Sequence, residues 1–120
     1  EKIFKIVLDS AFNVHSSLGP GLLESAYEEC LYYEITHSGL YVNKQVGMPL
    51  IYNEIRLDIG YRVDLLVENK VVTEVKSVKA LVNIHMAQIL KYLKLSKCKL
   101  GLLANFNVTH LKNGIKRVIL

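Results

Sequence analysis

The chain has 120 residues, of which 51% are hydrophobic and 22% are charged, and 15 Lys and Arg against 11 Asp and Glu give a net charge of +4. This length predicts one folded domain, residues 1–120, because two domains of half this size would each lack an adequate core. The composition excludes a disordered chain, and no apolar run approaches the roughly 20 residues of a membrane helix. We therefore expect no membrane segment.

Cys30 and Cys98 have no zinc-knuckle spacing, and the sequence has no secretory leader. These two features predict a cytoplasmic protein.

Two helices are expected at the start of the chain. Apolar residues at helical spacing predict the first helix from Lys2 to Leu18. The segment Gly19-Pro20-Gly21 ends this helix, because the residue before a proline disfavours the helical conformation. Since proline is well suited to the first turn of a helix, a second helix is predicted from Pro20 to Ser38.

Five β-rich segments are expected between Tyr41 and Lys76. Short turn sequences separate them, which predicts hairpins in an antiparallel meander. We interpret the first two segments as one interrupted strand. The segments are Val42–Val46, Leu50–Tyr52, Ile55–Leu57, Tyr61–Val67 and Val71–Lys76.

A third helix and two more strands complete the predicted order. Asn83 is suited to cap a helix that runs to about Leu95. The apolar side of this helix is expected to carry Ile84, Ala87, Leu90 and Leu93. Leu100–Phe106 is predicted to be a buried strand, and a tight turn at Asn113-Gly114 leads to a last strand, Ile115–Leu120. The order predicts an α/β domain (α+β mixed) with helices packed against one sheet.

The hairpin made by residues 61–67 and 71–76 places charged residues among valines and leucines. Because strand side chains alternate between faces, the odd-numbered residues form an almost purely apolar face, which we expect to be core. The opposite face carries Arg62, Asp64, Leu66, Val72, Glu74 and Lys76. If Glu68–Lys70 is the loop, paired residue numbers sum to 138, and Asp64 lies directly opposite Glu74.

Two opposed carboxylates would have their Cβ atoms roughly 4.5–5.5 Å apart and would repel each other. A divalent cation relieves this repulsion, and oxygen ligands favour Mg²⁺ or Mn²⁺. Lys76 shares the face of Glu74, where its ammonium group could orient a water or neutralise charge on a phosphate. The alternative is a solvated sheet face with a weak ion pair between Lys76 and Glu74, since so short a pattern also recurs by chance.

The sequence resembles a known group of nucleases. Asp64 followed by Glu74-Val75-Lys76 matches the bipartite signature of the PD-(D/E)xK nuclease superfamily. The segment Gly21-Leu22-Leu23-Glu24-Ser25-Ala26-Tyr27 is similar to the motif for which the GxxExxY proteins are named, and further matching segments extend the resemblance over nearly the whole chain. Gln88-Ile89-Leu90-Lys91-Tyr92 looks like the QxxxY motif of RecB-like exonucleases.

This resemblance implies a restriction-endonuclease-like core, with a central mixed sheet of about four strands flanked by helices. It implies that Glu24 is a further acidic residue directed toward the metal, and that Gln88 fixes the geometry of the lysine, of a water or of the substrate backbone. There are two departures from the pattern. Val63 stands where the signature has proline, and the chain has no added DNA-recognition subdomain.

Several residues are candidates for contact with nucleic acid. Lysines and arginines of the third helix and last strand, Lys91, Lys116 and Arg117, form either a phosphate-binding surface or an ordinary solvated face. Tyr92 could stack on a base or fill the edge of the core. Arg62 could anchor a phosphate or one of the site carboxylates.

The leading hypothesis is a Mg²⁺-dependent (or Mn²⁺-dependent) nuclease acting on nucleic acid, with DNA favoured over RNA. Its predicted metal ligands are Glu24, Asp64 and Glu74, and its predicted catalytic residues are Asp64, Glu74, Lys76 and Gln88. The alternatives are an inactive nucleic-acid-binding or partner-binding module with the nuclease fold, and a structural domain with a chance match. A homodimer is left open.

Overall fold

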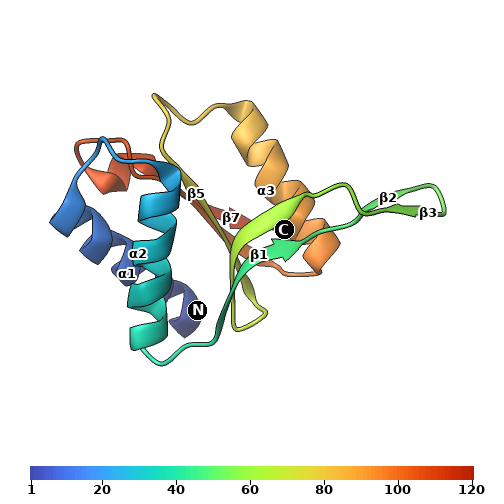
Figure 1. The fold of residues 1–120 in the computed structure, drawn as a ribbon, viewed down its shortest axis with the longest axis horizontal. Helices are drawn as coiled ribbons and strands as arrows, with labels where there is room; N and C mark the ends of the chain where they lie inside the picture. Colours follow the sequence, from blue (N-terminus) through green and yellow to red (C-terminus); the bar gives the residue numbers. More distant parts are fainter.

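A computed structural model describes all of residues 1–120. It has the predicted mixed α/β architecture, with helices on both faces of one mixed sheet and a small hairpin that projects away from it (Figure 1). The elements in chain order are α1 (Lys2–Leu18), α2 (Glu24–His37), β1 (Val42–Gly47), β2 (Leu50–Tyr52), β3 (Ile55–Leu57), β4 (Arg62–Val67), β5 (Val71–Lys76), α3 (Asn83–Ser96), β6 (Leu100–Asn105), the 3₁₀ turn η1 (Leu111–Gly114) and β7 (Ile115–Ile119).

The main sheet has five strands in the order β1-β4-β5-β6-β7, one more than the resemblance implied. Neighbouring strands are antiparallel except β5 and β6, which are parallel. A parallel pair requires a crossover connection, and α3 provides it between β5 and β6. This crossover brings α3 back across the strand that ends at Lys76.

Both faces of the sheet are covered. One core of 16 buried residues joins the sheet to α1 and α2, and it includes the expected odd-numbered residues Leu65, Val67, Val71 and Val75. A second core of 10 buried residues lies against α3 and includes Leu66 and Val72. The even-numbered face is therefore part core and part site. Val63 also belongs to the second core, because backbone pairing is interrupted beside Asp64 and strict alternation does not continue past it.

The beginnings of two helices differ from the predictions. The second helix begins at Glu24 and not at Pro20, because Gly19 and Gly21 have φ values of 65° and 104°, outside the helical region. The buried hydroxyl of Tyr27 stabilises this loop by donating to the Gly19 carbonyl at 2.6 Å. Asn83 does not cap α3. The N-cap is Val82, whose backbone N–H donates to Nδ1 of His85 at 3.0 Å.

The interpretation of Val42–Val46 and Leu50–Tyr52 as one strand was wrong. β2 pairs only with β3, in a separate two-stranded sheet, while β1 pairs with β4. Pro49 lies between β1 and β2 and has no N–H to donate to a ladder, so pairing with β4 ends there. The chain leaves the main sheet after β1, forms the projecting hairpin and returns as β4 (Figure 1).

No helix combines the length and apolar character needed to cross a bilayer.

Candidate active site at the β4–β5 hairpin

Asp64 and Glu74 lie where the backbone pairing of β4 and β5 stops. The observed pairs, Val67 with Val71 through Leu65 with Thr73, have the predicted register. The next pair would be Asp64 and Glu74, but here side chains replace backbone groups. A carboxylate oxygen of Glu74 accepts the Asp64 backbone N–H at 2.9 Å, and a carboxylate oxygen of Asp64 accepts the Val75 backbone N–H at 2.8 Å.

Burial makes this pair electrostatically unfavourable when both carboxylates are ionised. Glu74 is only 3% exposed. Burial, and then the charge of Asp64, raises its pKa to about 8. Burial also raises the pKa of Asp64, although the hydrogen bond from Val75 and the charge of Lys76 oppose this rise. Without a cation, Glu74 is therefore mainly protonated at neutral pH, and its ionisation is favoured only when positive charge is added nearby.

Lys76 is oriented by a hydrogen-bond chain from α3. Its Nζ donates to Oε1 of Gln88 at 3.0 Å, and Nε2 of Gln88 lies 3.4 Å from the hydroxyl oxygen of Tyr92. Gln88 and Tyr92 are one helical turn apart, so they share a face of α3. Tyr92 is buried, and burial, followed by the charge of Glu74, raises the pKa of its hydroxyl. The tertiary structure therefore brings all four predicted catalytic residues, Asp64, Glu74, Lys76 and Gln88, into one cluster.

Two further polar residues of this site were not found from the sequence. Nε2 of Gln45 donates to Glu28 at 2.8 Å and to Asp64 at 3.3 Å, so this amide bridges α2 and β4. Burial raises the pKa of Glu28, and the charge of Asp64 adds to this effect, while the Gln45 hydrogen bond opposes it. The sequence did contain one signal, since Glu28 follows Glu24 by four residues and shares its helical face.

Glu24 lies beside the end of β5. A carboxylate oxygen of Glu24 accepts the Ser77 backbone N–H at 3.1 Å, and the Ser77 hydroxyl donates to the Leu22 carbonyl at 2.7 Å. Its charge is near enough to contribute to the raised pKa of Asp64. However, no group of three or more His, Cys, Asp and Glu side chains is arranged to hold a metal ion. Glu24, Asp64 and Glu74 are therefore not gathered into one ready-made set of ligands.

The donor chemistry of Asp64 and Glu74 nevertheless fits a divalent cation. Both supply hard carboxylate oxygens, and Oε1 of Glu74 accepts none of the hydrogen bonds in the site. Mg²⁺ keeps several waters and is bound through as few as one or two carboxylates. The raised pKa values of this pair show that ionising both carboxyls is unfavourable without a cation, and a bound divalent ion would offset this cost.

The predicted nucleic-acid contacts are distributed over different parts of the surface. Arg62 is exposed beside the site, and its guanidinium donates to the Gln45 carbonyl at 3.3 Å. Lys91 is exposed on α3, whereas Tyr92 is only 5% exposed and has little ring surface for stacking. Lys116 and Arg117 are exposed on β7, where successive side chains point to opposite faces. Arg117 is paired with Glu1 at 2.6 Å and lies over the Phe4 ring.

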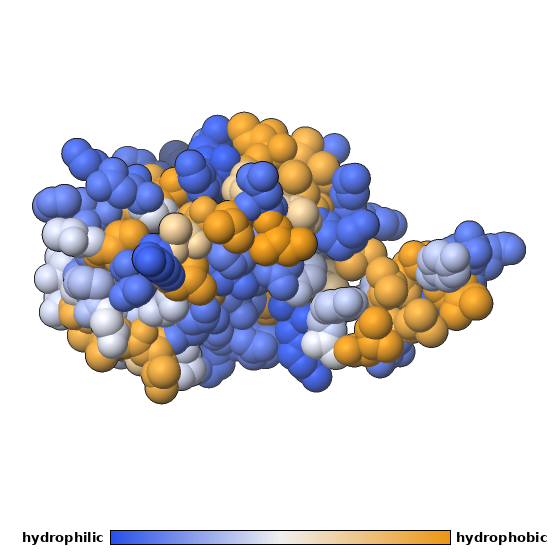
Figure 2. Space-filling model, turned by 90° about the horizontal axis from the view of Figure 1, so that it is seen from above, coloured by the Kyte–Doolittle hydropathy of each residue, from blue (hydrophilic) through white to orange (hydrophobic).

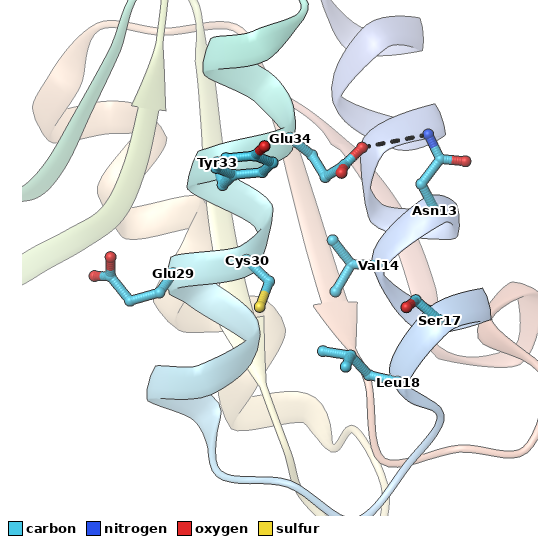
Figure 3. A pocket seen from close by; sticks show the side chains of 8 residues that line it. All are labelled: Asn13, Val14, Ser17, Leu18, Glu29, Cys30, Tyr33 and Glu34. Carbon is cyan, nitrogen blue, oxygen red and sulfur yellow. Dashed lines mark hydrogen bonds between the residues drawn. The ribbon is translucent and has the colours of Figure 1, made fainter.

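A groove with a volume of about 390 Å³ lies elsewhere, between α1 and α2. Figure 3 shows the side chains of Val14, Leu18 and Cys30 directed into the space between the two helices. At one end of it, Asn13 donates to Glu34 at 3.5 Å. None of its lining residues belongs to the cluster around Asp64. The groove is therefore separate from the candidate active site, which lies on the interior strands β4 and β5.

The five-stranded mixed sheet flanked by helices is consistent with the nuclease class of α/β domains. The family model of the PD-(D/E)XK nuclease superfamily matches residues 1–118. The chain belongs to this superfamily. No curated protein and no solved structure matched the chain.

Proposed function

We propose that this chain is a metal-dependent phosphodiesterase that cleaves nucleic acid, with DNA preferred over RNA. The single observation that carries the proposal is the pair Asp64 and Glu74, fixed at a break in the β4–β5 ladder with Lys76 next to them on the same strand. Such a pair costs stability in a metal-free protein, because burial raises the pKa of both carboxyls and the charge of Asp64 adds to the rise for Glu74. A functional requirement for the pair accounts for its presence.

Asp64 and Glu74 are the residues proposed to hold Mg²⁺ or Mn²⁺. Glu24 and Glu28 add negative charge from successive turns of α2, with Glu28 linked to Asp64 through Gln45. When bound, the ion would supply Lewis-acid stabilisation of the charge on the phosphorus oxygens and the leaving oxygen.

Lys76 is proposed to position the attacking water and to stabilise negative charge on the phosphate. Its ammonium donates to Oε1 of Gln88 at 3.0 Å, which leaves two of its N–H bonds available to a water and a phosphate oxygen. Gln88 thereby fixes where the ammonium lies, and Tyr92 in turn contacts Nε2 of Gln88. A preorganised donor of this kind needs no reorganisation as charge develops.

The nucleic-acid partner is supported by the positive net charge of the chain and by its exposed basic residues. The net charge is +4 with the site carboxylates counted as ionised. A bound divalent cation cancels the charge of Asp64 and Glu74 toward a polyanion, so the substrate would meet a more basic surface. Arg62, Lys91 and Lys116 are exposed and are proposed as phosphate contacts.

We also propose that the chain belongs to the GxxExxY group within the superfamily. In the Gly21–Tyr27 motif, Gly21 has a φ of 104°, and the Tyr27 hydroxyl both donates to the Gly19 carbonyl and accepts the Leu22 N–H. These contacts hold the Leu22 carbonyl against the Ser77 hydroxyl and place Glu24 on the Ser77 N–H. The motif therefore connects α2 to the residue after Lys76.

Both cysteines are free thiols, which supports a proposed cytoplasmic location.

The decisive experiment is a cleavage panel of single-stranded, duplex and branched DNA and RNA in Mg²⁺ and in Mn²⁺, with Lys76→Ala as the negative control. Cleavage by the wild-type protein that Lys76→Ala abolishes supports the proposal. Salt-dependent binding without cleavage under every condition would instead support an inactive binding module that retains the nuclease fold.

A further inference from the structure

The hairpin β2–β3 forms an arm, residues 50–61, that projects from the body of the molecule (Figure 1). Leu50 pairs with Leu57 and Tyr52 pairs with Ile55, so these four apolar side chains lie on one face of the arm. Every residue from Ile51 to Arg62 is exposed, and Tyr52 is 65% exposed. Figure 2 shows the apolar surface along this arm, standing away from the main body. Nothing within the chain covers it.

One edge of β3 is also unpaired. β3 pairs with β2 alone, so the backbone groups along its other edge have no strand beside them. An isolated two-stranded hairpin is marginally stable in water, and an exposed apolar edge is a template for pairing with another chain. The arm is therefore built to accept a further strand.

The sequence of β3 and the two residues after it is complementary to itself when two copies run antiparallel. In Ile55-Arg56-Leu57-Asp58-Ile59, apolar residues alternate with one positive and one negative residue placed symmetrically about Leu57. Antiparallel pairing centred on Leu57 places Arg56 of one copy opposite Asp58 of the other, and Ile55 opposite Ile59. A parallel in-register pairing would instead bring like charges together. The segment thus favours its own antiparallel copy.

We propose that two copies of this chain associate through the free edges of β3, paired antiparallel about Leu57 into a four-stranded sheet. The interface is isologous, since each copy contributes the same residues to both charge pairs. Arg56 and Asp58 lie 3.5 Å apart within one chain and are well exposed, so this weak pair is free to exchange for the pairs between copies. The arm also carries Glu54, and its two acids against one arginine make it a poor phosphate-binding surface.

The test is sedimentation equilibrium of the full chain over a wide range of protein concentrations. The wild type is expected to form a reversible dimer. Arg56→Asp alone places an acid opposite an acid in both charge pairs between the copies. Asp58→Arg alone places an arginine opposite an arginine in both pairs. Because like charges repel, each single variant is expected to raise the dimer dissociation constant by roughly tenfold or more. The double variant Arg56→Asp/Asp58→Arg restores complementary charges and is expected to dimerise like the wild type. An equimolar mixture of the two single variants is expected to form a heterodimer.

These exposed substitutions leave both cores intact, and melting temperatures equal to that of the wild type, measured at a concentration at which all variants are monomeric, verify this for each variant. A monomeric wild type at every concentration overturns the proposal. So does a dimer that the single variants leave unchanged, because it must then use another surface, and so does a double variant that stays monomeric. The readout is mass alone and is independent of whether the protein cleaves nucleic acid.

Discussion

Glu74 accepts a hydrogen bond at 2.9 Å from the backbone N–H of Asp64, while the carboxylate of Asp64 accepts one at 2.8 Å from the residue that follows Glu74. Each acid thus binds the backbone of the opposite strand at the point where ladder pairing ends. These two hydrogen bonds hold both side chains in place without a cation. They also force two carboxylates together in a site that is largely removed from water, which raises their pKa values.

The first prediction concerns the lysine. Lys76→Ala is expected to lower the rate of phosphodiester cleavage by roughly 10²–10³-fold, because it removes a preorganised cationic donor. Metal affinity and melting temperature should change little, since Lys76 is only half-buried and its side-chain hydrogen bond is to Gln88 alone. The exposed Lys79 is the matched control, and Lys79→Ala should cleave like the wild type. Equal cleavage rates for both variants would exclude the assigned role of Lys76.

The second prediction separates Gln88 from Tyr92. Gln88→Ala is expected to slow cleavage by roughly ten- to hundredfold, because it frees the Lys76 ammonium that its Oε1 holds at 3.0 Å. Tyr92→Phe should have a much smaller effect, since it removes only the 3.4 Å contact to Gln88. Steady-state kinetics of the two variants would show this ranking. The opposite ranking would indicate that the tyrosine hydroxyl acts on the substrate itself.

The third prediction is a pH dependence of stability in metal-free protein. The pKa of Glu74 is about 8 in the folded state, against 4.5 for an ordinary glutamate carboxyl, so the folded state binds more protons than the unfolded state between these two pH values. Its contribution to stability is therefore full below about pH 4.5 and is lost as pH rises toward 8. Melting temperatures measured in a chelator should fall over this window. Glu74→Gln should flatten the fall, and an unchanged slope in that variant would contradict the assignment.

The fourth prediction concerns the two acids of α2. Glu28→Gln is expected to weaken Mg²⁺ binding more than Glu24→Gln does, because Gln45 links Glu28 to Asp64 while Glu24 is engaged by the Ser77 N–H. Calorimetric titration of both variants gives the ranking. Asp64→Asn should abolish binding in the same assay. A stronger effect of Glu24→Gln would favour Glu24 as the third metal ligand, as the resemblance implied.

The fifth prediction is a stabilising change away from the site. Thr73 is fully buried on the core face of β5, and its Oγ1 has no hydrogen-bond partner. Replacing a buried unsatisfied hydroxyl by a methyl group of the same shape avoids a desolvation penalty of about 1–3 kcal/mol. Thr73→Val should therefore raise the melting temperature by several degrees at unchanged cleavage activity. A lower melting temperature would show that the hydroxyl has a partner in solution.

Local rules were sufficient for much of the hairpin that carries the site. The number of residues in the loop between β4 and β5 fixes the register, and the alternation of strand side chains then places Asp64 near Glu74 with Lys76 on the same face. These relationships depend only on neighbouring residues along the chain. For the same reason, α1 has the bounds that its apolar periodicity predicted.

The faces of helices and the partners of side chains depend on what packs against them. Ile84 was expected on the apolar side of α3 but is 70% exposed, whereas Ile89 is fully buried against the sheet. The spacing of apolar residues did not distinguish which face of this weakly amphipathic helix packs on the sheet. The crossover between the parallel strands β5 and β6 decides which face does so. The arm likewise arises because Pro49 interrupts the pairing of β1 with β4, an event outside either strand.

By itself, the sequence determined which residue types lie on one face of one hairpin, because loop length and strand alternation are local. Only the tertiary structure decided that Gln45 joins Glu28 to Asp64, that Gln88 holds Lys76, and that Glu74 is buried deeply enough to raise its pKa to about 8. Each of these depends on distances between elements far apart in the chain. Such distances are set by how the helices pack on the sheet, and burial then sets the strength of the charges they bring together.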